Sequence, residues 1–76
     1  MTLRIITPVL VDEHTVEAVF LPGAAGAFEV LKGHAPIISA LSAGEVRWRD
    51  ASGESSQPVQ GGMVMVENDI ITVCVE

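Results

Sequence analysis

The sequence is poor in cysteine, in basic residues and in long apolar runs. Cys74 is the only cysteine, which excludes an internal disulfide and a multi-cysteine zinc cage. No apolar stretch approaches the ~18 residues that would span a bilayer, and no charged segment leads into a long apolar one at the N-terminus, so we expect no signal peptide. These absences predict a protein that lies in the cytosol or faces it.

Positive charge is scarce, since the chain has 4 Lys and Arg residues and 10 Asp and Glu residues. The formal net charge is -6, and the basic residues are scattered along the chain. An acidic chain without a basic run is a poor phosphate binder. We therefore expect no nucleic-acid partner.

What the chain does contain is typical of a folded domain. Its 76 residues are 49% hydrophobic and 18% charged, which is too apolar for a disordered segment and too short for two domains. We predict a single domain over residues 1–76.

Alternation with a period of two dominates the hydrophobic pattern, and no helical period persists for ten residues. The expected strands cover residues 3–7, 9–11, 15–21, 27–31, 36–41, 44–50, 58–60, 63–66 and 70–75. Polar or turn-forming residues separate them, notably at 12–14, in a hairpin tip at 50–57 and in a turn at 67–69. Short strands at this spacing predict an all-β sandwich or barrel.

Two details of the strand pattern concern the surface. Residues 44–50 alternate cleanly, so Val46 and Trp48 should point into the core. By contrast, residues 63–66 and 70–73 are apolar on both faces, which indicates either a strand at the junction of two sheets or a surface that meets another protein. The pair Gly61-Gly62 indicates a bulge or a close backbone approach.

Candidate catalytic residues are few. Cys74 lies in a β-branched run and is expected to be buried. Ser42 lacks the leading glycine of a nucleophile elbow, and His14 and His34 are not spaced as metal ligands. Residues 22–26 are rich in glycine but lie between two strands and lack a following Lys-Ser or Lys-Thr, so they predict no phosphate site. We expect no catalytic, metal or cofactor site.

Two loops are candidates for contacts with a partner. The loop at residues 22–26 is small and apolar where a solvated loop normally carries charge, so another backbone could approach it closely. In Gly33-His34-Ala35-Pro36, glycine and proline hold His34 at a rigid corner. That histidine suits either a hydrogen bond within the turn or a contact with a partner.

The ordered motifs along the chain resemble those of one family. They are Leu21-Pro22-Gly23, Gly26, Gly33-His34-Ala35-Pro36, Leu41, Gly44, Gly61-Gly62 and Thr72-Val73. In this order and spacing they resemble the N-terminal domain of the epsilon subunit of F-type ATP synthases, which is called delta in mitochondria. The resemblance covers essentially the whole chain.

The resemblance implies a two-sheet β-sandwich of about ten short strands. It also implies a non-catalytic subunit of the central stalk, which docks on the gamma subunit and on the c subunits of the rotor ring and helps to couple proton flow to ATP synthesis. No cofactor is implied. The complex would lie peripherally on the cytoplasmic side of the inner or plasma membrane, and this domain would meet the membrane only through the complex.

Three departures from the family pattern matter. The sequence given ends at Glu76, straight after the last expected strand, which fits either a naturally short form or a truncated one. For this form we expect no C-terminal helical hairpin and no inhibition of ATP hydrolysis through one. Ala27 replaces an acidic residue that often faces the rotor ring, and Glu29 is a candidate substitute. Met65 lies where a polar residue is common, and a methionine there suits an adaptable apolar contact.

The candidate contacts with gamma or the rotor ring are Ala25, Gly26, Ala27, Glu29, Lys32, His34, Met63 and Met65, together with the Gly61-Gly62 edge. Two alternatives remain open at this stage. One is a free-standing β-sandwich that binds a ligand or a peptide along an open edge. The other is an enzyme that uses His14, His34 and Cys74.

Overall fold

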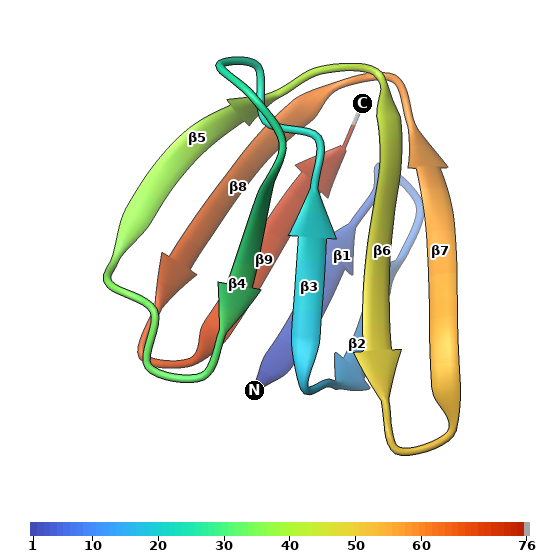
Figure 1. Ribbon diagram of the computed structural model, residues 1–76. Coiled ribbons are helices and arrows are strands. Elements are labelled where there is room, and N and C mark those ends of the chain that lie inside the picture. The colour runs from blue at the N-terminus through green and yellow to red at the C-terminus, as the bar shows by residue number, and fades with distance from the viewer. Residues whose placement is uncertain (76) are drawn as a thin grey trace.

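The computed structural model describes residues 1–75 and consists of two packed β-sheets (Figure 1). Within these residues the chain forms nine strands and no helix, so the predicted β-sandwich is confirmed. The strands are β1 (Thr2–Ile6), β2 (Val11–Thr15), β3 (Ala18–Leu21), β4 (Phe28–Leu31), β5 (Ile37–Leu41), β6 (Gly44–Asp50), β7 (Gly53–Val59), β8 (Gly62–Glu67) and β9 (Ile70–Val75). Residue 76, the last of the predicted domain, lies outside the described residues.

The two sheets differ in size and in the order of their strands. One has five strands in the order β2-β1-β9-β8-β5, and the other has four in the order β4-β3-β6-β7. In Figure 1 the four-stranded sheet lies in front of the five-stranded sheet. The pairing of β1 with β9 is parallel, and the other strand pairs are antiparallel. The N-terminal strand thus lies beside the C-terminal one at the middle of the larger sheet.

The core fills the space between the inner faces of the two sheets, as the alternation of residues predicts. Val46 and Trp48 are buried, which confirms their expected direction. The buried apolar side chains are those of Leu3, Ile5, Val16, Val19, Leu21, Val30, Leu41, Val46, Trp48, Val59, Val64, Val66, Ile71 and Val73. Strands β1, β6, β8 and β9 bury alternate residues, so their remaining side chains point to the outer faces of the two sheets.

The prediction of a strand over residues 9–11 that ends at the polar residues 12–14 was wrong, because residues 9 and 10 lie in a turn and the polar residues lie in the edge strand β2. The turn lies earlier, where the Thr7 side chain accepts a hydrogen bond from the Leu10 backbone N–H at 3.1 Å. On β2 the His14 ring packs on Trp48 with centroids 4.7 Å apart, and its Nε2 lies 3.0 Å from Asp12 Oδ2. An edge strand can keep polar side chains half-buried, because one side of it remains open to water.

The polar segment 50–57 was predicted as a hairpin tip, but most of it is strand β7. The turn itself is short, and the Asp50 carboxylate stabilises it by accepting a hydrogen bond from the Ser52 N–H at 2.8 Å. Gly53 then adopts a φ of 130° at the start of β7. β7 is an edge strand with most of its side chains exposed, so its serines and glutamate are solvated without being in a loop.

Two other predicted features of the backbone are confirmed. Asn68 and Asp69 have φ values of 52° and 60°, so the turn at 67–69 uses the tolerance of these residues for the left-handed region. At Gly62, where φ is 144°, an added Cβ would overlap the carbonyl oxygen of Cys74. Gly62 is therefore the predicted close approach between β8 and β9.

Candidate docking surface

The outer face of the five-stranded sheet carries a row of uncharged, mostly apolar side chains that crosses all five strands. From β2 to β5, strand pairing places Val11, Ile6, Cys74, Met63 and Ala40 side by side. The next residue along each strand turns to the opposite face of the sheet, and the adjacent row of the same face consists of Glu13, Arg4, Thr72, Met65 and Ile38. A sheet face in water normally alternates apolar-in with polar-out, so the uncharged row indicates a surface that another protein covers.

Further exposed apolar side chains extend the row. Their exposed fractions are 70% for Ile38, 45% for Met65 and 43% for Ile70, and Met63 within the row is 47% exposed. Ile38 pairs directly with Met65 across β5 and β8. We call this surface the apolar face and define it by Val11, Ile6, Cys74, Met63, Ala40, Met65, Ile38 and Ile70.

The apolar face continues into the turn between β1 and β2. Val9 is 87% exposed, and Leu10 is also exposed. The turn is held in shape by backbone hydrogen bonding between Thr7 and Leu10 at 2.9 Å. An ordered turn that presents two large aliphatic side chains to solvent is a further indication of contact with a partner.

The outer face of the four-stranded sheet is different in kind. One of its rows consists of Glu29, Phe20, Arg47 and Ser56 in register. The Arg47 guanidinium lies 5.1 Å from the centroid of the Phe20 ring, so the basic side chain covers the aromatic one. Charge of both signs and a covered aromatic ring are typical of a solvated surface. The five-stranded sheet also carries one ion pair on its outer face, between Arg4 and Glu13 in the row beside Ile6 and Val11. Its uncharged row and the exposed side chains of Ile38 and Met65 nevertheless make it the candidate docking surface.

Met63 and Met65 are the two predicted contact residues that lie on the apolar face. The prediction that Cys74 is buried was wrong, because its side chain is exposed. Ile71 and Val73 take the inward positions of β9, so alternation turns Cys74 outward beside Met63. A run of apolar residues does not reveal which of its members face the core, since β9 is apolar on both faces.

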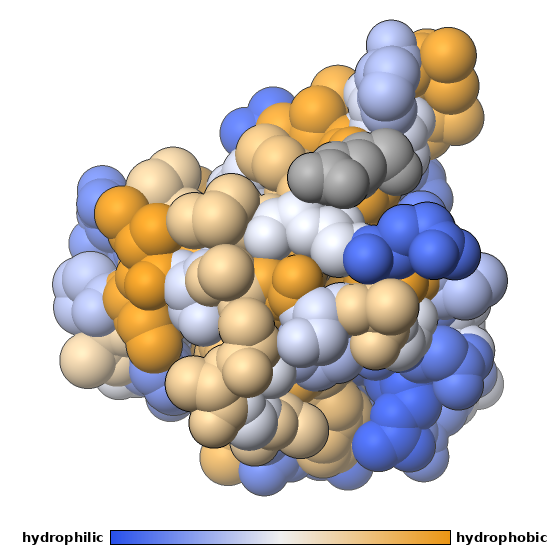
Figure 2. Space-filling model, turned by 90° about the horizontal axis from the view of Figure 1, so that it is seen from above, coloured by the Kyte–Doolittle hydropathy of each residue, from blue (hydrophilic) through white to orange (hydrophobic). Residues whose placement is uncertain are grey.

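The other predicted contacts divide between the two ends of the sandwich. Ala25, Gly26 and Ala27 are exposed in the loop between β3 and β4, at the upper end in Figure 1. This loop is anchored to β5 by a hydrogen bond from the Ala24 N–H to the Ala40 carbonyl at 2.9 Å. Figure 2 looks onto this end and shows apolar atoms across its middle and left, with hydrophilic atoms at the lower right.

Lys32 and His34 lie in the loop between β4 and β5, at the lower end in Figure 1. The Gly33 N–H donates to Asp69 Oδ1 at 2.8 Å, which ties this loop to the turn between β8 and β9. His34 Nδ1 lies 2.7 Å from the carbonyl oxygen of Ala35, so the imidazole bonds within its own turn. β4 separates this loop from residues 25–27, and the two predicted groups therefore do not form one site.

Glu29 occupies a third position. It lies in β4 opposite Phe20, on the outer face of the four-stranded sheet, and its side chain is exposed. It therefore belongs to the charged surface rather than to the loop that contains Ala27.

The structure does not bring together the three residues of the enzyme hypothesis. His14 packs toward the core against Trp48, whereas Cys74 lies on the outer face of the same sheet. His34 lies in the loop at the lower end. Among residues 1–75, no group of three or more His, Cys, Asp or Glu side chains is arranged to hold a metal ion.

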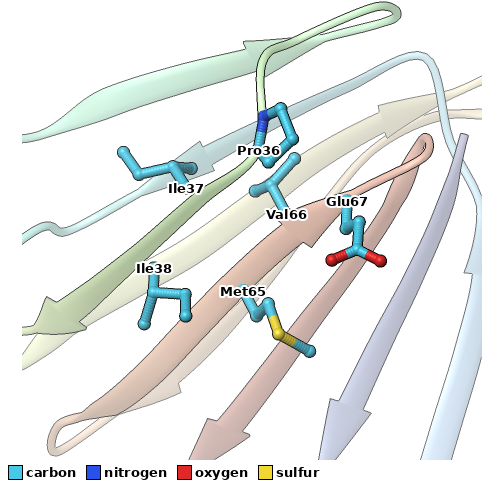
Figure 3. A pocket seen from close by; sticks show the side chains of 6 residues that line it. All are labelled: Pro36, Ile37, Ile38, Met65, Val66 and Glu67. Carbon is cyan, nitrogen blue, oxygen red and sulfur yellow. The ribbon is translucent and has the colours of Figure 1, made fainter.

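A hollow of about 320 Å³ opens between β5 and β8 at the margin of the apolar face. Its lining is apolar except for one carboxylate, and consists of Pro36, Ile37, Ile38, Met65, Val66 and Glu67 (Figure 3). The ligand-binding alternative requires a polar-lined concavity, and this lining does not favour it.

Within the described residues, no helix is long and apolar enough to cross a membrane.

Comparison with known sequences agrees with the motifs. The family model described as "ATP synthase, Delta/Epsilon chain, beta-sandwich domain" matches residues 1–76. The ATP synthase epsilon chain of Microcystis aeruginosa is 40% identical over 76 residues, which are 99% of this chain and 55% of that one. The chloroplastic epsilon chain of Cyanidium caldarium is 33% identical, with 99% of this chain and 57% of that one covered. The chain thus spans about half the length of these curated relatives.

Solved structures agree on the fold. A chain in the Euglena gracilis mitochondrial ATP synthase (OSCP/F1/c-ring) superposes with a TM-score of 0.87 at 18% identity, over 96% of this chain and 48% of that one. A chain in the central stalk and c-ring of the Tetrahymena thermophila mitochondrial ATP synthase superposes with a TM-score of 0.81 at 12% identity, over 97% of this chain and 61% of that one. At these identities the likeness shows a shared fold.

Proposed function

The chain belongs to the family of the ATP synthase delta/epsilon β-sandwich domain, and we propose that it is a non-catalytic part of the central stalk of a rotary ATP synthase. In this role it binds the gamma subunit and the c subunits of the rotor ring, and it helps to couple proton flow to ATP synthesis. The complex that contains it lies peripherally on the cytoplasmic side of the inner or plasma membrane.

The uncharged row across the five-stranded sheet is the observation that supports docking. The chain carries a net charge of -6, yet the row from Val11 to Ala40 contains no charged side chain. Apolar surface on an acidic domain is stabilised only when a partner removes it from water. We assign this face to gamma.

We assign a partner to each of the loops at the two ends of the sandwich, using the family resemblance and the position of each loop. Residues 25–27 are small and exposed, so they allow the polar loops of a c subunit to approach the backbone, and we assign this end to the rotor ring. Lys32 and His34 lie beside the turn that leads into Ile70 of the apolar face. We therefore assign that loop to gamma.

Binding to gamma tests the proposed function directly. The purified chain should co-elute with the gamma subunit of the same ATP synthase in size-exclusion chromatography, because the apolar face is covered only in the complex. A chain that elutes as a monomer beside excess gamma would defeat the proposal. A permanent stalk contact implies a dissociation constant on the order of 1 μM or below, which corresponds to about 8 kcal/mol of binding free energy.

A further inference from the structure

The hollow between β5 and β8 contains one charged group in apolar surroundings. Ile38 and Met65 pair across the two strands, and Figure 3 shows Met65 followed along β8 by the carboxylate of Glu67. On its other side Glu67 pairs with Ile70 of β9. The Glu67 carboxylate thus lies at the margin of the apolar face, with exposed apolar side chains on both neighbouring strands.

Among residues 1–75 no basic side chain forms an ion pair with this carboxylate, although Lys32 lies in the loop that Gly33 ties to the neighbouring turn at Asp69. Arg4 lies 3.0 Å from Glu13 and is the only basic residue besides His14 that forms an ion pair within residues 1–75. Arg47 packs over Phe20 on the opposite sheet. In the free chain water solvates Glu67, since its side chain is exposed.

Docking changes the surroundings of Glu67. A partner that covers Ile38, Met65 and Ile70 also removes water from the carboxylate between them. A desolvated carboxylate is costly unless a cation or hydrogen-bond donors replace the lost water. The partner must therefore provide a cation or hydrogen-bond donors beside Glu67, and the apolar lining of the hollow favours an apolar group of the partner inside it.

We propose that this hollow receives an apolar side chain of a basic segment of gamma, and that a lysine or arginine of the same segment pairs with Glu67. The inference rests on the proposed function and specifies the chemistry of the partner at one position. Net charge supports this occupant, since a chain at -6 attracts a basic segment. A second copy of this chain is disfavoured, because it would bring another acidic surface to the same hollow.

Two exposed glutamates provide a matched test. Glu67→Gln removes the charge at the hollow and keeps the size of the side chain, whereas Glu45→Gln makes the same change at an exposed position of β6 in the other sheet. Binding of each variant to gamma is measured by titration calorimetry at several salt concentrations. A circular dichroism melt of each variant checks that the fold is kept.

For Glu67→Gln we expect binding about tenfold weaker than wild type at low salt, because a charge-assisted pair is lost. The slope of log Kd against log salt concentration should also become shallower, since one ion pair fewer is screened. Glu45→Gln should bind like the wild type. Equal affinity and equal salt dependence for Glu67→Gln would overturn the pairing and leave the proposed function intact.

Two other outcomes would separate the inference from its premise. Tighter binding by Glu67→Gln would show that gamma presents no cation here, which contradicts the inference alone. The free chain could instead self-associate, with an affinity that changes in Glu67→Gln. That result would place a second copy of the chain in the hollow and would likewise contradict the inference. If the wild-type chain does not bind gamma at all, the proposed function fails and the inference fails with it.

Discussion

Replacing Met63 with aspartate is expected to weaken binding to gamma by about 100-fold, which is about 2.7 kcal/mol. Met63 lies within the uncharged row, between Cys74 on β9 and Ala40 on β5. Its side chain is 47% exposed in the free chain, so water can solvate an aspartate there and the fold is kept. In the complex the same carboxylate would be buried among apolar groups without a partner, which is costly.

The control for Met63→Asp adds the same charge to the opposite sheet. Ser56 is exposed on β7, on the outer face that carries Arg47. Ser56→Asp should therefore bind gamma as the wild type does. Titration calorimetry measures both affinities, and urea unfolding of the free variants checks their stability. Equal loss of binding in the two variants would show that total charge, and not the apolar face, controls docking.

Replacing Gly62 with alanine is expected to lower the free energy of unfolding by about 3 kcal/mol or more. Two costs combine at this position. A φ of 144° is a conformation that residues with a side chain rarely adopt, and the added methyl group would overlap the carbonyl oxygen of Cys74. Relief of that overlap requires β8 and β9 to separate at this end of their pairing, which weakens the hydrogen bonds beside Met63.

Gly53→Ala separates the two costs. Gly53 has a φ of 130°, but nothing lies within 4 Å of the position of an added Cβ. This variant bears the backbone cost alone, which we expect to be about 1–2 kcal/mol. Urea unfolding of both variants measures the difference. If Gly62→Ala is no less stable than Gly53→Ala, the close approach between β8 and β9 is not a tight constraint.

The sequence predicted the class of fold and most of its turns because those depend on local chemistry. Alternation correctly placed Val46 and Trp48 inside, and Asn68 and Asp69 form their turn because they tolerate positive φ. The errors arose where polar residues lie in edge strands. Residues 12–14 and 53–57 look like loops in the sequence, but each belongs to a strand with one edge open to water.

The docking surface could be predicted only in part, because it depends on pairing between distant strands. The two apolar faces of residues 63–66 and 70–73 indicated a contact, and Met63 and Met65 do lie on the apolar face. Val11, Ile6 and Ala40 gave no signal of their own, since each is an ordinary apolar residue of a short strand. Only the registers of β1, β2 and β5 place them in one row with Met63.

The position of Cys74 in that row provides a direct test of the central claim. As the only cysteine, and an exposed one, it can be alkylated by a maleimide without competing sites. A Cys74→Ser, Ser56→Cys variant carries the same probe on the other sheet. We expect an excess of gamma to slow the alkylation of Cys74 by about tenfold or more, because a covered thiol is shielded from the reagent, and to leave the cysteine at position 56 reactive. Unchanged alkylation of Cys74 in a complex that protects position 56 would contradict docking through the five-stranded sheet.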